Sequence, residues 1–234
     1  MKKLVIILVV LLVQANFVNA QDLSSILKKH YEATGTEKLA KVKTMYSEIE
    51  MSMMGMQMAG KTYLKRPGKI RTEVEMMGNT MKMGSDGTDF WALNPMSGEP
   101  MDMPEDQRTQ LVQQVDFEGA LWNYKAKGNT VKYLGTGEKD GRKYYKLDVT
   151  VKSMKGVKMV MYIDKETYLL GYQDAEVQGM AVTNKFLNYN EIEGIKFPTQ
   201  FTTSSNGVEQ MTVKIKNTAF NKEMADSMFV RPKK

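Results

Sequence analysis

The stretch Lys69-Ile70-Arg71-Thr72-Glu73-Val74-Glu75-Met76 carries the clearest structural signal in this 234-residue chain. The even-numbered positions hold uncharged side chains, and every position between them holds a charged one. Residues two apart on a strand point to the same face of a sheet. The stretch therefore predicts a β-strand with one dry face and one wet face.

The same alternation recurs along the rest of the chain, in residues 145–151, 157–163 and 211–215. Turn-forming pairs separate the alternating stretches: Pro67-Gly68, Gly78-Asn79, Asp86-Gly87, Asp140-Gly141, Glu193-Gly194 and Asn206-Gly207. Such spacing is typical of hairpins in an antiparallel sheet that is wet on one side. We expect ten or more strands, enough to make the sheet curl toward a barrel.

Helical periodicity is confined to two segments. Residues 22–33 place Leu23, Ile26, Leu27 and Tyr31 at helical spacing, and Gly35 follows as a stop signal. Residues 104–115 begin with a proline and carry an apolar side at Leu111, Val112 and Val115. There is no linker and no repeat, so we expect residues 21–234 to form a single domain.

The N-terminus has the pattern of a secretory signal peptide. Lys2 and Lys3 precede an unbroken apolar run over residues 4–13, and Val18-Asn19-Ala20 is a small-residue cleavage site. The run is too short to span a bilayer as a helix. We expect residues 1–20 to be removed after Ala20 and the chain to reach the periplasm. An uncleaved membrane anchor is the alternative.

Composition excludes several classes of function. The chain has no Cys and one His, His30, so disulfide scaffolds, thiolate zinc sites and cysteine nucleophiles are absent. Basic and acidic residues are interspersed at a net charge of +6, without the basic stripe of a nucleic-acid-binding protein. No phosphate loop, hydrolase elbow or dinucleotide fingerprint occurs. We expect a protein that is not an enzyme, with no catalytic residues, no cofactor and no nucleic-acid partner, and His30 at the surface.

Methionine is the unusual residue type, at 21 residues against 8 Phe and 2 Trp. Met51 and Met53 share one face of a predicted strand, with Glu48 and Glu50 on the other. An ordinary core with Met as gap-filler is one explanation. A face of flexible, unbranched side chains also suits a surface that repacks around varied apolar ligands. The candidate ligand-binding residues are Met51, Met53, Met56, Met58, Val74, Met76, Met81, Met83, Phe90 and Trp91.

Copper(I) binding is a further alternative for two groups of methionines, the run Met51-Ser52-Met53-Met54-Gly55-Met56-Gln57-Met58 and Met96 with Met101-Asp102-Met103. Thioethers are soft ligands that suit this ion. The only His is distant in sequence, no Cys assists, and the strand alternation already accounts for the positions. The sequence therefore predicts no metal site, and copper ranks below the apolar interpretation.

Several short motifs resemble the outer-membrane lipoprotein-sorting family, the LolA-like carriers. They are residues 30–39 (HYEATGTEKL) with Val42-Lys43-Thr44, 65–71 (KRPGKIR), 86–95 (DGTDFWALNP), 162–167 (YIDKET), Asn188-Tyr189 with 194–198 (GIKFP), and the closing 229–232 (FVRP). They extend over nearly all of residues 21–234, and their order and spacing carry the resemblance.

The resemblance implies a mainly β fold, a half-open antiparallel β-barrel with a helical lid over a concave apolar face. It also implies a monomeric periplasmic carrier of lipoprotein acyl chains or other lipids, with membrane-associated donor and acceptor proteins as partners. An envelope regulatory or sensor module that uses the same fold to bind lipid or a protein is the alternative. The methionine-rich face departs from the aromatic and branched residues of better-known carriers.

Overall fold

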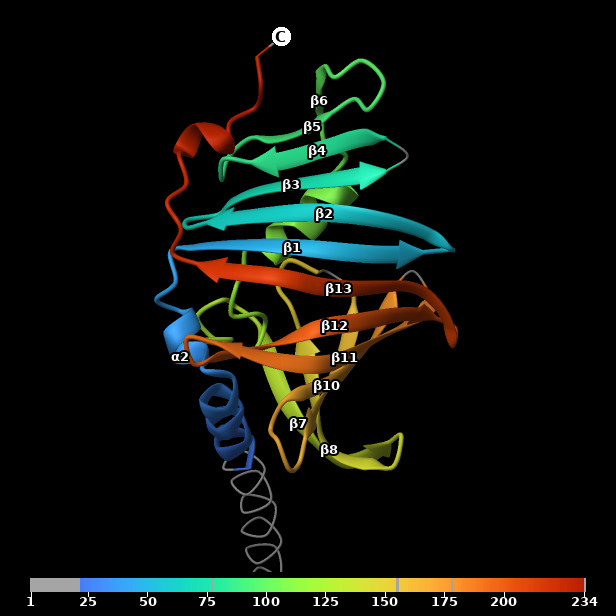
Figure 1. The fold of residues 1–234 in the computed structure, drawn as a ribbon. Coiled ribbons are helices and arrows are strands. Elements are labelled where there is room, and N and C mark those ends of the chain that lie inside the picture. The colour runs from blue at the N-terminus through green and yellow to red at the C-terminus, as the bar shows by residue number, and fades with distance from the viewer. Residues whose placement is uncertain (1–21, 77, 155, 178, 234) are drawn as a thin grey trace, which may run out of the picture.

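The computed structural model describes residues 22–233 except 77, 155 and 178 (Figure 1). The predicted signal peptide lies outside the described residues. The strands are β1 (Thr44–Met53), β2 (Met56–Lys65), β3 (Lys69–Met76), β4 (Asn79–Ser85), β5 (Phe90–Leu93), β6 (Pro100–Asp102), β7 (Thr130–Lys139), β8 (Arg142–Thr150), β9 (Lys158–Asp164), β10 (Leu170–Val177), β11 (Met180–Ile192), β12 (Ile195–Ser205) and β13 (Val208–Phe220).

These strands form one 13-stranded sheet in the order β6-β5-β4-β3-β2-β1-β13-β12-β11-β10-β9-β8-β7. Neighbouring strands are antiparallel. The first strand, β1, pairs with the last strand, β13, near the middle of the sheet. The sheet curls strongly, but β6 and β7 do not pair with each other, so the barrel stays half open (Figure 1). The predicted fold class is confirmed.

Within the described residues, three helical segments and a short 3-10 turn accompany the sheet. A helix occupies residues 22–34, followed by α2 (Thr36–Leu39), α3 (Glu105–Gln114) and the turn η1 (Asp226–Met228). Gly35 separates the first two at a φ of 67°, and a Cβ there would lie 2.0 Å from the carbonyl oxygen of Gly194. Only glycine fits this turn. None of the helices in the described part of the chain is long and apolar enough to cross a membrane.

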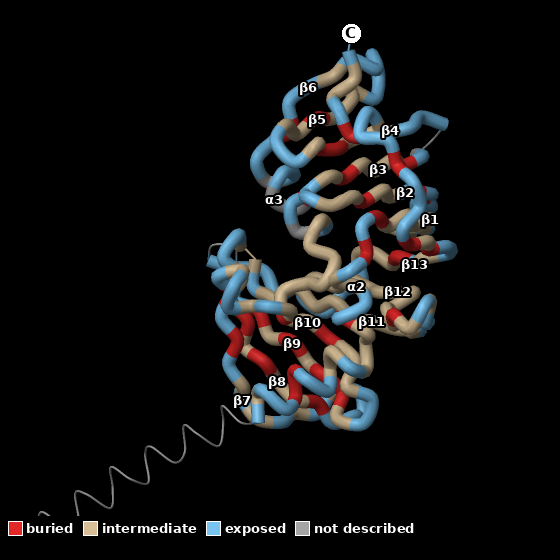
Figure 2. The backbone as a smooth tube through the Cα atoms, turned by 90° about the vertical axis from the view of Figure 1, so that its left-hand side faces the viewer, coloured by how far each residue is buried: buried red, intermediate tan, exposed pale blue. Residues whose placement is uncertain are grey.

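The strand register confirms which side chains share a face. Ile70 lies opposite Leu64, and Val74 lies between Gly60 on β2 and Met81 on β4. This dry face is the inner, concave one, because Leu64 and Ile70 pack with Leu111 of α3. Figure 2 shows α3 on the inner side of the curved sheet.

The core is divided among three buried clusters. The largest joins Ile26 and Leu27 of the first helix to Leu147, Val149 and Ile163 of β8 and β9. A second lies between β2, β3 and α3, and a third joins Val42, Ile195 and Phe220. The inner face of the sheet is thus covered in patches, by the first helix at one end and by α3 at the other.

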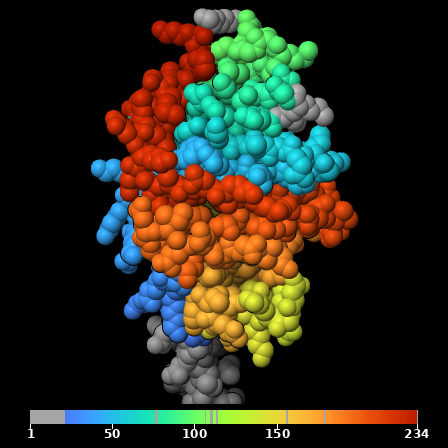
Figure 3. Space-filling view, viewed as in Figure 1, coloured from blue at the N-terminus to red at the C-terminus, as the bar shows by residue number. Residues whose placement is uncertain are grey.

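The C-terminal tail braces the outer side of β2–β5. Phe229 is fully buried, and its carbonyl oxygen accepts a 2.8 Å hydrogen bond from Nε1 of Trp91. Arg231 forms ion pairs with Asp89 at 2.7 Å and Asp102 at 2.8 Å. In Figure 3 the tail covers one side of the strands β1–β4.

Candidate functional site

Two cavities open on the concave face, one on each side of α3. The larger, of about 770 Å³, lies toward β8–β10. The smaller, of about 500 Å³, lies between α3 and β4–β6. Both fall within the roughly 300–1,000 Å³ typical of sites for small molecules. Because the sheet does not close, both are accessible from outside.

The larger cavity has an apolar wall and a polar mouth. Its wall includes Met154, Met159, Met161 and Leu170 from the sheet and the preceding loop, together with Val112 and Ala120 from the covering elements. The polar groups at the mouth are Lys127, Lys152, Asp116, Asn129, Ser153 and Gln173. This arrangement suits a ligand with a long apolar part and a polar end.

The mouth of the larger cavity is held together by polar contacts. The Lys127 ammonium pairs with Asp116 and donates a 2.9 Å hydrogen bond to the carbonyl of Gly119. Burial raises the pKa of the Asp116 carboxyl above its usual range, although the contact with Lys127 opposes this. The side chain of Lys152 is exposed at the same mouth. Lys152 is therefore the cation best placed to meet a charged group on a ligand.

The smaller cavity is built from residues that the sequence predicted in part. Met81 and Met83 line it together with Ala92, Leu93 and Met101 of β5 and β6, and Leu111 of α3 closes it. Phe90 is half-buried and packs against the cluster around Leu64 and Ile70 beside this cavity. Two predicted ligand-binding methionines therefore face a real cavity.

Other predicted residues share the concave face but lie outside both cavities. Met58 and Val74 are buried, Met51 and Met53 are half-buried, and Met56 is 36% exposed near the tip of the β1–β2 hairpin. They extend the apolar face away from α3. The side chain of Met76 lies outside the described part of the structure.

Trp91 requires a correction. It lies opposite Gly84 and Asp102 in the sheet, with its ring against Gly84, where a Cβ would come within 2.9 Å of the ring. It is fully buried beneath Phe229 of the C-terminal tail. The residue is on the outer face, one position out of phase with the methionines, and serves to anchor the tail rather than to line the site.

Sequence reasoning missed the residues of the larger cavity. The alternation over residues 157–163 had indicated that Met159 and Met161 are inward-facing, but not that they lie opposite α3. Their role depends on the curl of the sheet, which brings β8–β10 to face a helix that follows β6. A local sequence pattern does not show which distant elements the curl of the sheet brings together.

The cover next to α3 is fixed by Arg66. Its Nη2 donates a 2.8 Å hydrogen bond to Glu118, its Nε donates one of the same length to the carbonyl of Val42, and its guanidinium stacks 4.4 Å from the centre of the Phe117 ring. The Glu118 side chain is only 8% exposed. One arginine thus ties the segment after α3 to the start of the sheet.

The first helix is fixed by two polar contacts, one of which corrects a prediction. His30 is half-buried rather than at the surface, and its Nδ1 donates to the carbonyl of Tyr168 at 2.7 Å. Burial lowers the pKa of His30 below its ordinary value. Tyr31 donates to the carbonyl of Leu121 at 2.6 Å, and burial raises its pKa to about 12. Both contacts fix the helix through backbone carbonyls, and Lys29 adds a 3.2 Å hydrogen bond to the hydroxyl of Tyr168.

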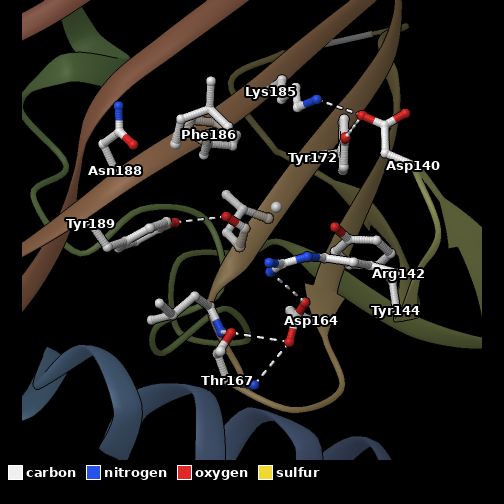
Figure 4. A pocket seen from close by; sticks show the side chains of 14 residues that line it. Asp140, Arg142, Tyr144, Asp164, Thr167, Tyr172, Lys185, Phe186, Asn188 and Tyr189 are labelled. Atoms are coloured by element: carbon white, nitrogen blue, oxygen red, sulfur yellow. Dashed lines mark hydrogen bonds and ion pairs between the residues drawn. The ribbon is translucent and has the colours of Figure 1, made fainter.

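A third cavity, of about 390 Å³, lies on the outer side of β8–β11 (Figure 4). Its charged groups already form ion pairs and hydrogen bonds with other residues of the cavity. Tyr172 donates to Asp140 at 2.5 Å, Lys185 pairs with the same carboxylate, and Arg142 lies 3.7 Å from Asp164. With these groups paired, we place the candidate site on the concave face. Among the described residues no group of three or more His, Asp or Glu side chains could hold a metal ion.

Solved structures share this architecture across nearly their whole length. A LolA superfamily protein from Nitrosomonas europaea superimposes with a TM-score of 0.61 at 16% identity, covering 89% of this chain and 97% of that one. A putative outer membrane lipoprotein-sorting protein domain from Vibrio parahaemolyticus gives 0.60 at 12% identity, covering 87% and 95%. A DUF1329 family protein from Desulfovibrio piger gives 0.62 at 16% identity, covering 87% and 96%.

The unclosed, strongly curled antiparallel sheet with an apolar inner face under short helices is the fold that this chain shares with these LolA superfamily and lipoprotein-sorting structures. No curated protein matches the chain in sequence. A sequence-family model described only as "-like: Uncharacterized protein" matches residues 62–233, well over half of the chain, and the chain belongs to that family.

Proposed function

We propose that this protein is an exported, non-enzymatic carrier that binds acyl chains of lipoproteins or other lipids on its concave face. The observation that carries the proposal is the pair of apolar cavities on either side of α3. A half-open sheet leaves a route for a long chain to enter from the side, which a closed barrel would not.

Burial of hydrocarbon supplies the binding free energy. Each CH₂ group removed from water contributes about 0.8 kcal/mol, so about ten buried carbons would contribute roughly 8 kcal/mol before the cost of ordering the chain. Methionine suits this task because its thioether side chain adopts many shapes at little cost. The polar end of the ligand would remain at the mouth, where Lys152 offers a positive charge to a carboxylate or phosphate.

Fold similarity and the N-terminal sequence support the rest of the proposal. The Vibrio parahaemolyticus domain of the same fold is described as lipoprotein-sorting. The predicted signal peptide would send the chain to the periplasm, where lipoproteins cross between membranes. We propose that it acts there as a monomer between membrane-associated donor and acceptor proteins.

A fluorescent fatty acid, cis-parinaric acid, tests acyl binding to the purified protein. Val112→Glu places a carboxylate in the larger cavity from a position on α3 that is 40% exposed. Met81→Glu does the same in the smaller cavity from a half-buried position. A carboxylate beside a bound acyl chain must lose water. The variant whose cavity holds the probe should therefore bind it more than about tenfold more weakly than the wild type does.

Leu134→Glu is the matched control, since Leu134 is a half-exposed residue of β7 outside both cavities. It should bind the probe as the wild type does. Thermal melting within a few degrees of wild type shows that each variant is folded. Absence of binding by the wild-type protein, or wild-type affinity in both cavity variants, would overturn the proposal.

A further inference from the structure

The tip of the β1–β2 hairpin concentrates methionine on the concave face. Met51 lies directly opposite Met58, and Met53 lies directly opposite Met56. On the other side of β1, Met53 faces Met211 of β13. We name Met51, Met53, Met56 and Met58 the methionine array. Adjacent pairs of the array are two residues apart on each strand, so all four side chains project from the same face.

The spacing of the array would let its sulfur atoms meet. Directly opposed residues of an antiparallel pair have Cβ atoms about 4.5–5.5 Å apart. The methionine side chain is long, unbranched and flexible, so thioethers from neighbouring positions can turn toward one point. Met211 provides a fifth sulfur next to Met53. Four or five thioethers are thus within reach of one ion.

Three of the four array residues are partly exposed, whereas the fourth, Met58, is buried. Met56 is 36% exposed and Met51 and Met53 are half-buried, whereas Leu147, Val149 and Ile163 of the covered core have no exposed surface. The array residues line neither cavity on the concave face. Among the described residues, the three buried clusters that include the covering helices contain none of the four array methionines.

The chemistry around the array selects soft cations. Glu48 and Glu50 point to the opposite face of β1, where Glu50 pairs with Lys216 at 3.0 Å. Hard ions such as Mg²⁺ and Ca²⁺ are held mainly by carboxylate oxygens, and neither strand of this hairpin places an Asp or Glu on the array face. Neutral thioethers suit copper(I) instead.

We propose that the methionine array binds one monovalent soft cation, copper(I), through thioether sulfur alone. The proposal goes beyond lipid carriage and does not depend on it. The structure adds what the sequence lacked, because the hairpin register places the four methionines in two opposed pairs. Because the chain has no Cys and its single His is bonded to Tyr168, the thioethers alone would have to hold the ion.

Copper(I) binding can be measured anaerobically under reducing conditions, in competition with the chromophoric chelator bicinchoninate. The wild type should bind one equivalent. The variant Met51→Leu/Met53→Leu/Met56→Leu/Met58→Leu keeps the apolar volume and removes the sulfur, so its affinity should fall by more than about tenfold. Silver(I), which is inert to redox change, should give the same pattern by native mass spectrometry.

The control variant is Met54→Leu/Met96→Leu/Met101→Leu/Met180→Leu, which removes four exposed methionines outside the array. It should retain the wild-type affinity. If the array variant is poorly folded, Met51→Leu/Met58→Leu alone should lower affinity, and X-ray absorption of the wild-type complex should show a sulfur-only shell. Equal loss in array and control variants, no loss in either, or oxygen and nitrogen ligands in the shell would overturn the proposal.

Discussion

The two halves of the concave face follow the same strand alternation but differ in how far their side chains are buried. Under the helix of residues 22–34, β8 and β9 present Leu147, Val149 and Ile163, all with no exposed surface. On β1 and β2, beyond the reach of α3, the same face presents the methionine array, whose exposure reaches 36% at Met56. One half is mostly buried core beside the larger cavity, and the other half is partly exposed.

The comparison teaches that the covering element, not the sheet pattern, decides between core and surface. Where the first helix packs on the sheet, Leu147, Val149 and Ile163 are fully buried, and even Met159 and Met161 beside them are at most 7% exposed. The array methionines belong to none of the three buried clusters, and three of the four are partly exposed. The following changes should strengthen or abolish this contrast, from the largest expected effect to the smallest.

Leu147→Ala should lower the free energy of unfolding by about 3–4 kcal/mol, because it leaves a cavity beneath the first helix. Met53→Ala on the open half should cost about 1 kcal/mol, since its side chain is only half-buried. Urea unfolding followed by tryptophan fluorescence measures both. Equal losses would mean that the two halves are packed alike and that the contrast is wrong.

Arg66→Ala should cost about 2 kcal/mol, because it leaves the largely buried carboxylate of Glu118 without its partner. Adding Glu118→Gln removes the uncompensated charge and should recover part of the loss. Hydrogen exchange should locate the effect in residues 115–125. A loss spread evenly over the sheet would mean that Arg66 does not fix the cover.

His30 makes the covered half sensitive to pH. Burial holds the pKa of His30 in the folded protein below the ordinary histidine value of about 6.5. Below pH 6.5 the unfolded chain therefore takes up a proton that the folded chain does not bind. Stability should therefore fall as the pH drops through this window, by at most about 1.4 kcal/mol per pH unit, until the folded pKa is reached.

The comparison with His30→Gln isolates this contribution from the carboxyl groups that also titrate. The variant should be less stable at neutral pH but should lose less stability than the wild type between pH 7 and the acid end of the window. Urea midpoints across the pH series measure the difference. Parallel profiles would show that His30 is not kept neutral by the fold.

Met56→Gln should have the smallest effect, within about 0.5 kcal/mol of the wild-type stability, because the side chain is exposed near a hairpin tip. The thermal midpoint should move by no more than a few degrees. A large loss would place Met56 in packed core and remove the contrast between the two halves at its most exposed point.

Much of the fold was predictable because its signals are local. The strand at Lys69–Met76 and the helix starting after Pro104 were found where the sequence predicted them, since period and turn residues fix them within a few positions. Trp91 was assigned to the wrong face of the sheet. On a strand as short as β5 the alternation gives few positions from which to judge phase, and the tail that buries Trp91 follows 138 residues later.

The sequence by itself determined the strands, their dry and wet faces, and the methionines that share the dry face, because each depends on neighbours within a few residues. Only the tertiary structure decided which parts of that face became core, cavity or open surface. That outcome depends on the curl of the whole sheet and on where α3, the first helix and Arg66 hold the cover. These contacts join residues that are far apart in the chain, so their energies cannot be derived from a local sequence pattern.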